Sequence, residues 1–81
     1  MSHVLLPLCF MNPQEIFGKR IKFYRTQKGY SQEELAFKAG LDRTYIASVE
    51  NGKRNVSIQT IGKFLKALDL SFSEFFRDFE V

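Results

Sequence analysis

Cysteine, histidine and tryptophan are nearly or entirely absent from this sequence of 81 residues. Cys9 is its one cysteine, His3 is its one histidine, and it has no tryptophan. A single cysteine excludes a disulfide within one chain and suits a reducing cytosol, so we expect a cytoplasmic protein. Because thiolate and imidazole ligands are so scarce, a zinc site is nearly excluded, and we expect neither a metal nor a cofactor.

Catalytic motifs are also lacking. His3 and Cys9 lie near the start of the chain, no glycine-rich phosphate loop occurs, and no pair of acids has a recognisable pocket context. The adjacent Glu33 and Glu34 are better explained by helix capping and a solvated helix face. The sequence therefore predicts a protein that is not an enzyme and has no small-molecule substrate.

No apolar run is long enough to cross a membrane. The first ten residues, MSHVLLPLCF, are apolar but are interrupted by Pro7, and a membrane span needs about 20 residues. A secretory signal would require a Lys or Arg before this run and a small-residue cleavage site after it, and neither is present. We interpret residues 1–11 as an N-terminal tail, with Met11 as an alternative start, or as an arm that packs on a partner. Residues 12–81 form the expected single domain.

What the sequence does contain is enough apolar content for one core, and frequent helix punctuation. Its hydrophobic fraction is 44%, and its net charge of +3 is only weak evidence for a polyanionic partner. No alternating apolar run is long enough to predict a sheet. We therefore expect an all-α fold, a compact bundle of five short helices.

Side chains that suit a helix N-cap mark where these helices begin. The expected N-caps are Asn12, Ser31, Asp42, Ser57 and Ser71. At 31–34 and 71–74 the spacing of serine and glutamate is that of a capping box, and the second of these precedes FFRDFEV. The expected ends of the first three helices are Gly29, Gly40 and Gly52. The clearest apolar stripe, in the fourth helix, consists of Ile58, Ile61, Leu65 and Leu68.

The third of these helices is too short to be stable alone. A helix of about nine residues is marginal in water, so a neighbour must hold it. That neighbour is the helix opened by Ser31, and two short helices joined by a tight glycine turn form a helix-turn-helix. In this motif the second helix presents its N-terminal residues to the major groove of DNA. With Ile46 and Val49 directed inward, the expected base-facing residues are Arg43, Thr44, Ala47 and Ser48.

These residue types suit contacts with DNA. Arg43 can donate two hydrogen bonds to guanine, a contact that contributes about 1–3 kcal/mol of discrimination. The residues expected to contact phosphate or to form a contacting loop are Ser31, Gln32, Tyr45, Asn51, Lys53, Arg54 and Asn55. Three alternatives stay open: Tyr45 stacks on the sugar-phosphate or packs inward, Arg54 reaches phosphate or a base edge, and residues 53–55 contact DNA or are a solvated loop.

Charge and aromatic residues are unevenly distributed along the chain. The cations of the first helix, which the motif places on the DNA side, are Lys19, Arg20, Lys22, Arg25 and Lys28. Near the C-terminus, aromatic and apolar residues exceed what one short helix can bury beneath itself. We expect the surplus to form an exposed patch that a second copy of the chain covers. The expected dimer-interface residues are Leu70, Phe72, Phe75, Phe76 and Phe79.

The segment GYSQEELAFKAGLDRTYIASVENGKRN resembles the helix-turn-helix family of phage repressors and Cro proteins, the xenobiotic-response-element type. The resemblance covers about residues 14–70. The positions that carry it are Gln32, Leu35-Ala36, Gly40, Ile46 and Glu50-Asn51-Gly52. Within the family, LDRTYIASVENGKRN followed by a serine-capped helix is most similar to the controller proteins of restriction-modification systems. The leading MSHVLLPLCF departs from the usual family pattern.

This resemblance implies a lambda-repressor-like DNA-binding domain that acts as a homodimer on an operator near its own gene. It implies that Gln32 touches phosphate or supports the reading helix, and that Arg54 and Asn55 belong to a DNA-contacting loop. It further implies an ion pair between Arg25 and Glu50. The alternative is an antitoxin-like or other small repressor whose main role is protein–protein interaction.

Overall fold

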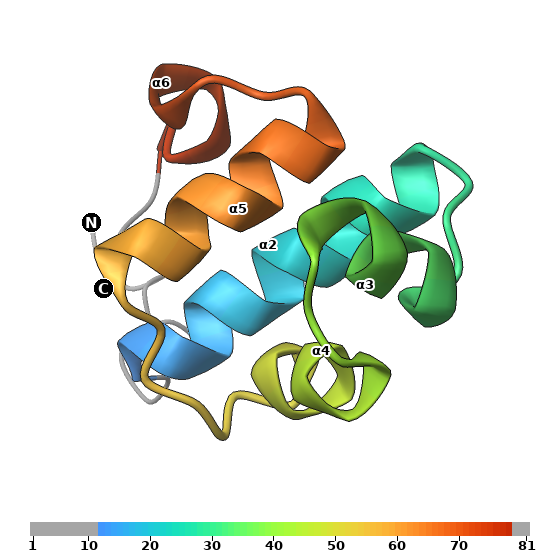
Figure 1. Cartoon of the computed structure of the whole chain (residues 1–81). Helices are drawn as coiled ribbons and strands as arrows, with labels where there is room; N and C mark the ends of the chain where they lie inside the picture. The colour runs from blue at the N-terminus through green and yellow to red at the C-terminus, as the bar shows by residue number, and fades with distance from the viewer. Residues whose placement is uncertain (1–11, 79–81) are drawn as a thin grey trace.

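The computed structural model describes residues 12–78, and this range folds into five helices joined by short turns (Figure 1). The helices are α2 (Pro13–Gln27), α3 (Gln32–Ala39), α4 (Arg43–Glu50), α5 (Ile58–Leu68) and α6 (Phe72–Phe75). The all-α prediction is confirmed. The predicted tail or arm at residues 1–11, and Phe79, lie outside the described residues.

Each helix begins at the N-cap that the sequence predicts. The Asn12, Ser31 and Ser71 side chains accept hydrogen bonds from backbone amides three residues ahead. The glutamate side chain at each of those positions in turn accepts a hydrogen bond from the backbone amide of the N-cap residue. Asp42 caps α4 and Ser57 caps α5 through single side-chain contacts to backbone amides. These bonds satisfy amides that a helix leaves unpaired, so local sequence determines where the helices start.

The last helix, α6, makes a single turn, residues 76–78 form a further turn, and Asp78 adopts a left-handed φ of 57°. Arg20 Nη1 donates to the carbonyl oxygens of Phe75 at 2.7 Å and Arg77 at 2.6 Å. Because a side chain from α2 satisfies carbonyls at the end of α6, the chain has less to gain from a longer helix. Arg20 therefore belongs to the α6 end of the molecule, which corrects its predicted place among the DNA-side cations.

The core is formed by residues from all five helices. The largest fully buried side chains are Phe64, Phe75, Ile21, Leu35, Ile46, Leu68 and Val49. Burying one such side chain stabilises a fold by about 1.5–3 kcal/mol. The inward positions predicted for Ile46 and Val49 are confirmed. The predicted stripe of α5 needs correction at its first position, because Ile58 is 67% exposed.

Phe75 is an anchor of this core. It is 0% exposed, and its ring centroid lies 5.4 Å from that of Phe17, 5.7 Å from Tyr24 and 4.8 Å from Phe76. The sequence predicts Phe75 at a dimer interface, and the structure corrects this prediction. Because α6 contacts α2 through this ring, Phe75 is covered by its own chain and has no surface for a second copy.

Gly18 lies where α2 passes close to the end of α4. A Cβ atom on Gly18 would lie 2.1 Å from the Val49 carbonyl oxygen and 3.0 Å from that of Glu50. Distances this short to backbone atoms leave no room for a side chain. The absence of a Cβ at this position therefore determines how closely the end of α4 packs on α2.

We expect Gly18→Ala to destabilise the protein by about 1–3 kcal/mol, the usual range for overpacking a close contact. Gly62→Ala in α5 is the matched control, because nothing lies within 4 Å of the added Cβ. In a helix interior this change removes a penalty of about 1 kcal/mol, so the control should gain stability. Urea unfolding measures both, and stabilisation by both variants would contradict the close packing of α2 on α4.

Candidate nucleic-acid interface

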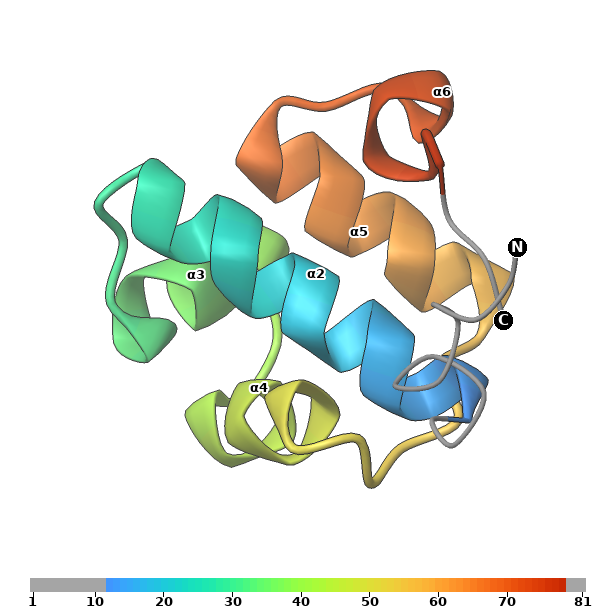
Figure 2. The ribbon, with the colours of Figure 1, turned by 180° about the vertical axis from the view of Figure 1, so that it is seen from behind.

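α3 and α4 are joined by a tight turn at Gly40. This residue caps α3 with a left-handed φ of 69°, and the Leu41 amide donates to the Ala36 carbonyl at 2.9 Å. Asp42 then caps α4, so the chain reverses within two residues of the end of α3. In both ribbon views α4 lies at one edge of the molecule, on the opposite side from α6 (Figures 1 and 2). The outer face of α4 is therefore open to a partner.

That outer face carries the four residues predicted to face DNA bases. Arg43 and Thr44 are exposed, and Ala47 and Ser48 are half-buried. The opposite face is fixed in the core, where Ile46 is 0% and Val49 is 1% exposed. Because the apolar face of this short helix packs in the core, the polar side chains on its other face can contact a partner without loss of core contacts.

The Asp42 cap also orients Thr44. The Asp42 carboxylate accepts the Thr44 backbone amide at 2.9 Å and the Thr44 hydroxyl as well. The hydroxyl bond is the main cause that lowers the pKa of Asp42 below its ordinary value, followed by the amide bond. Since the hydroxyl proton is engaged with Asp42, Thr44 presents its methyl group and its oxygen lone pairs to a partner.

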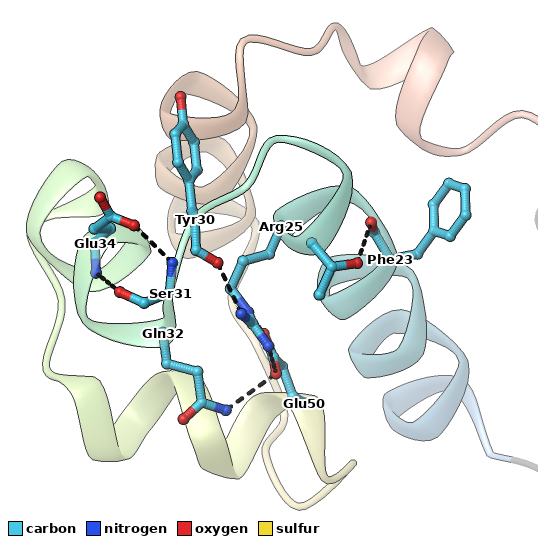
Figure 3. A network of polar contacts seen from close by, with 8 residues as sticks. Phe23, Arg25, Tyr30, Ser31, Gln32, Glu34 and Glu50 are labelled. Atoms are coloured by element: carbon cyan, nitrogen blue, oxygen red, sulfur yellow. Dashed lines mark hydrogen bonds and ion pairs between the residues drawn. The ribbon is translucent and has the colours of Figure 1, made fainter.

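A buried ion pair holds the far end of α4. Arg25 Nε lies 2.6 Å from Glu50 Oε2, and Arg25 Nη2 donates to Glu50 Oε1 at 3.1 Å. The two side chains are only 11% and 3% exposed. Arg25 Nη1 also donates to the Tyr30 carbonyl at 2.8 Å (Figure 3). The pair implied by the family resemblance is thus confirmed, and it connects α2 and the turn before α3 to α4.

Gln32 joins the same network from the first residue of α3. Its Nε2 donates to Glu50 Oε1 at 3.1 Å (Figure 3). Of the two roles implied for Gln32, the structure shows support of the reading helix. Nearby, Ser31, Gln32 and Arg43 line an open hollow together with Arg25 and Glu33. This hollow is where the start of α3 meets the start of α4.

The loop after α4 is anchored to the domain at several points. Gly52 has a left-handed φ of 73° and its amide donates to the Val49 carbonyl, while the Lys53 amide donates to the Ser48 carbonyl at 3.0 Å. The Gln14 side-chain amide donates to Asn55 Oδ1. The exposed side chains of this loop are Asn51, Lys53, Arg54 and Asn55. They therefore project from a fixed backbone.

Tyr45 packs inward, which resolves one alternative left open by the sequence. It is half-buried against the core. One face of its ring lies under Arg54, whose Cζ is 5.0 Å from the ring centroid. The helix and the loop that follows it are thus in direct contact.

The sequence does not predict the structural roles of two residues at this surface. Gly18 allows the approach of α2 to α4, and Gln14 anchors the loop at Asn55. Lys19, one of the cations predicted on the DNA side, lines a hollow with Glu50 at the end of α4. A glycine inside a helical pattern can indicate close packing, so the position of Gly18 within the pattern of the first helix could have predicted this contact. Gln14 and Asn55 are 41 residues apart, and no local pattern connects them.

Residues 12–78 contain no group of three or more His, Cys, Asp or Glu side chains that could hold a metal ion. Nor does any helix in this range have the length and apolarity needed to cross a membrane.

A capped helix that supports a second, outward-facing helix across a glycine turn defines a helix-turn-helix DNA-binding domain. A profile of the helix-turn-helix family matches residues 21–75, and the chain belongs to this family.

Within the family the chain is similar to restriction-modification controllers. It is 45% identical over 64 residues to control protein C.SmaI of Serratia marcescens, which covers 79% of this chain and 76% of that protein. The chain is 51% identical in sequence to the restriction-modification controller protein C.AhdI from Aeromonas hydrophila. Its fold matches the crystal structure of that protein with a TM-score of 0.75, over 78% of this chain and 96% of that one. The C.Esp1396I tetramer in complex with its natural 35 base-pair operator is 37% identical, with a TM-score of 0.79, and covers 84% and 90%.

We expect Glu50→Leu to cost about 3–5 kcal/mol of stability, because it leaves the buried Arg25 charge without a partner. The double variant Arg25→Met, Glu50→Leu should recover most of that loss, since apolar side chains can replace a buried pair with little net change. Urea unfolding of the wild type and both variants measures the effect. An unchanged single variant, or a double variant no more stable than the single one, would contradict the role assigned to the pair.

Proposed function

We propose that this chain is a sequence-specific DNA-binding transcriptional regulator, the controller protein of a restriction-modification system, and that it acts as a dimer on its own operator. The observation that carries the proposal is the polar outer face of α4, which is held in place by the close packing at Gly18 and by the Arg25–Glu50 ion pair. The relatives support the controller role, since C.AhdI and C.Esp1396I are restriction-modification controller proteins and C.Esp1396I is seen on its operator.

In this proposal the start of α4 enters the major groove. The Arg43 guanidinium donates to the O6 and N7 atoms of a guanine, which present a matching pair of acceptors. The Thr44 methyl packs on a thymine methyl, since its hydroxyl proton is engaged with Asp42. Ala47 allows the helix to approach the bases closely, and Ser48 donates to or accepts from a base edge.

On either side of α4, contacts with the DNA backbone fix the register of the protein on the duplex. At the start of α3 the contacting residues are Ser31 and, through its remaining amide oxygen, Gln32. After α4 they are Asn51, Lys53, Arg54 and Asn55. Contacts with phosphates position a protein without reading sequence and make its affinity strongly salt-dependent.

The proposed function requires no catalytic residue and no cofactor, and the protein would act in the cytoplasm. The antitoxin-like alternative is not favoured by the relatives.

The dimer in this proposal uses an apolar surface on α5 and α6. Ile58 is 67% and Phe72 is 46% exposed. The Phe72 and Phe76 rings stack with their centroids 6.0 Å apart, and Phe76 lines an apolar groove together with Ile61. These four residues and the half-buried Leu70 form the proposed interface, and we call them the α5–α6 surface. Phe75, which the sequence also predicts there, is buried in the core.

A two-fold axis at the α5–α6 surface would leave both copies of α4 free. Helix-turn-helix dimers read two half-sites about one helical turn of DNA, ~34 Å, or a multiple apart. Residues 12–81 would then form one domain whose last helix contributes to dimerisation.

We expect Arg43→Ala to weaken specific binding by about 1–3 kcal/mol and to relax the choice of base at one operator position. Lys66→Ala is the matched control, because it removes one exposed cation from α5 instead of α4. Binding to a library of duplexes derived from the region upstream of the gene, titrated at several salt concentrations, measures both effects. Loss of affinity by the control alone, or an unaltered base preference in Arg43→Ala, would move recognition away from α4.

We expect Ile58→Asp and Phe72→Glu each to shift the protein from dimer to monomer, because each places a charge within the α5–α6 surface. Phe37→Glu is the control, since Phe37 is 87% exposed on α3 and lies outside that surface. Sedimentation equilibrium measures the mass in solution. If both variants keep the mass of the wild type, the dimer uses another surface. Phe75 is unsuitable for this test because a charge there would disrupt the core.

A further inference from the structure

Arg54 occupies an unusual position for an exposed loop side chain. Its guanidinium carbon lies 5.0 Å from the centre of the Tyr45 ring, within the range of a cation–π contact. Arg54 is four residues beyond the end of α4, whereas Tyr45 is in the first turn of that helix. The loop therefore carries a cation back along α4 towards the end that carries Arg43.

The Tyr45 ring is a fixed platform. It is half-buried and packed against the core, so its position follows from that of α4. Tyr45 and Ser48 are three residues apart and are neighbours on the helix surface. The ring thus lies at the border of the outer face, next to one of the four proposed base-facing residues.

The loop on either side of Arg54 is also held. The Lys53 amide donates to the Ser48 carbonyl at 3.0 Å, and the Asn55 side chain accepts from the Gln14 amide. Between these two anchors the Arg54 side chain rests on the Tyr45 ring, which restricts its freedom before a partner binds. Ordering a long side chain costs about 0.5–1.5 kcal/mol at an interface, and stacking in the free protein removes part of that cost in advance.

A guanidinium that stacks by its flat face keeps its N–H donors available at its edge. These donors lie in the plane of the group and match acceptor pairs on phosphate and on guanine. Because Arg54 is exposed, its edge can be reached from solvent while its face rests on Tyr45.

We propose that Tyr45 is a positioning residue that acts on DNA binding through Arg54. The ring holds the guanidinium beside the outer face of α4, so that Arg54 adds a fifth side chain to the surface made by Arg43, Thr44, Ala47 and Ser48. This inference rests on the proposed DNA-binding function. It assigns the contribution of Tyr45 to its ring face and not to its hydroxyl group.

A double-mutant cycle in the full chain tests the proposal. We expect Tyr45→Phe to bind operator DNA within about twofold of the wild type, because the ring is retained. Tyr45→Leu should weaken binding by about two- to fivefold, the range of an exposed cation–π contact. Arg54→Ala should weaken it about tenfold or more, as loss of a charged hydrogen bond does. The double variant Tyr45→Leu, Arg54→Ala should bind no more weakly than Arg54→Ala alone.

Lys53→Ala provides the matched control for the cycle. Lys53 is the neighbouring exposed cation, and its contribution should simply add to that of Tyr45→Leu. Base preference at each operator position separates the two possible sources of the Arg54 contact. A changed preference in Arg54→Ala identifies a base edge, and a uniform loss across sequences identifies phosphate.

Two results would overturn the proposal. One is a Tyr45→Leu effect that is equally large with and without Arg54, which would give Tyr45 a direct or purely structural role. The other is a loss in Tyr45→Phe that matches Tyr45→Leu, which would assign the effect to the hydroxyl.

A measurement without DNA separates this inference from the proposed function. In the NMR spectrum of the free protein, the Arg54 side-chain protons should show an upfield ring-current shift that persists in Tyr45→Phe and disappears in Tyr45→Leu. If the wild type fails to bind any duplex but the shift is present, the proposed function is wrong and the contact is real. If binding is present and the shift is absent, the positioning role is wrong.

Discussion

The ion pair between Arg25 and Glu50 is the interaction on which the rest of this surface depends. It joins α2 to the last residue of α4, while Gln32 and the Tyr30 carbonyl bring the start of α3 into the same network. A carboxylate at a helix C-terminus is unfavourable by itself, and the guanidinium offsets that cost. Since burial makes an unpaired charge expensive, a shift of the three helices that broke these contacts would be costly.

Most of the fold could be predicted from the sequence because its signals are local. Each N-cap lies within three residues of the amide it accepts from, and the inward positions of Leu35, Ile46 and Val49 follow helical periodicity. The errors lie where distant segments meet. Arg20 of α2 donates to the carbonyl oxygens of Phe75 and Arg77, and the Phe75 ring is buried against Phe17 of α2. Neither contact is visible in the local pattern.

The candidate site divides in the same way. The exposed positions of Arg43 and Thr44 follow from the periodicity of an eight-residue helix. The stacking of Arg54 on Tyr45 and the bond from Gln14 to Asn55 depend on a loop whose path only three-dimensional packing defines. The sequence predicts Tyr45, Arg54 and Asn55 as contact residues, and the structure adds the contacts that hold Arg54 and Asn55 in place.

Mapping of backbone amide shifts during titration with operator DNA tests most directly whether the outer face of α4 is the recognition surface. We expect the largest NMR shift changes at Ser31 and Gln32, along 43–48 and in the loop 53–55, and only small changes at amides of the α6 region. Changes concentrated in α6 and the C-terminal half of α5, with α4 unaffected, would contradict this expectation.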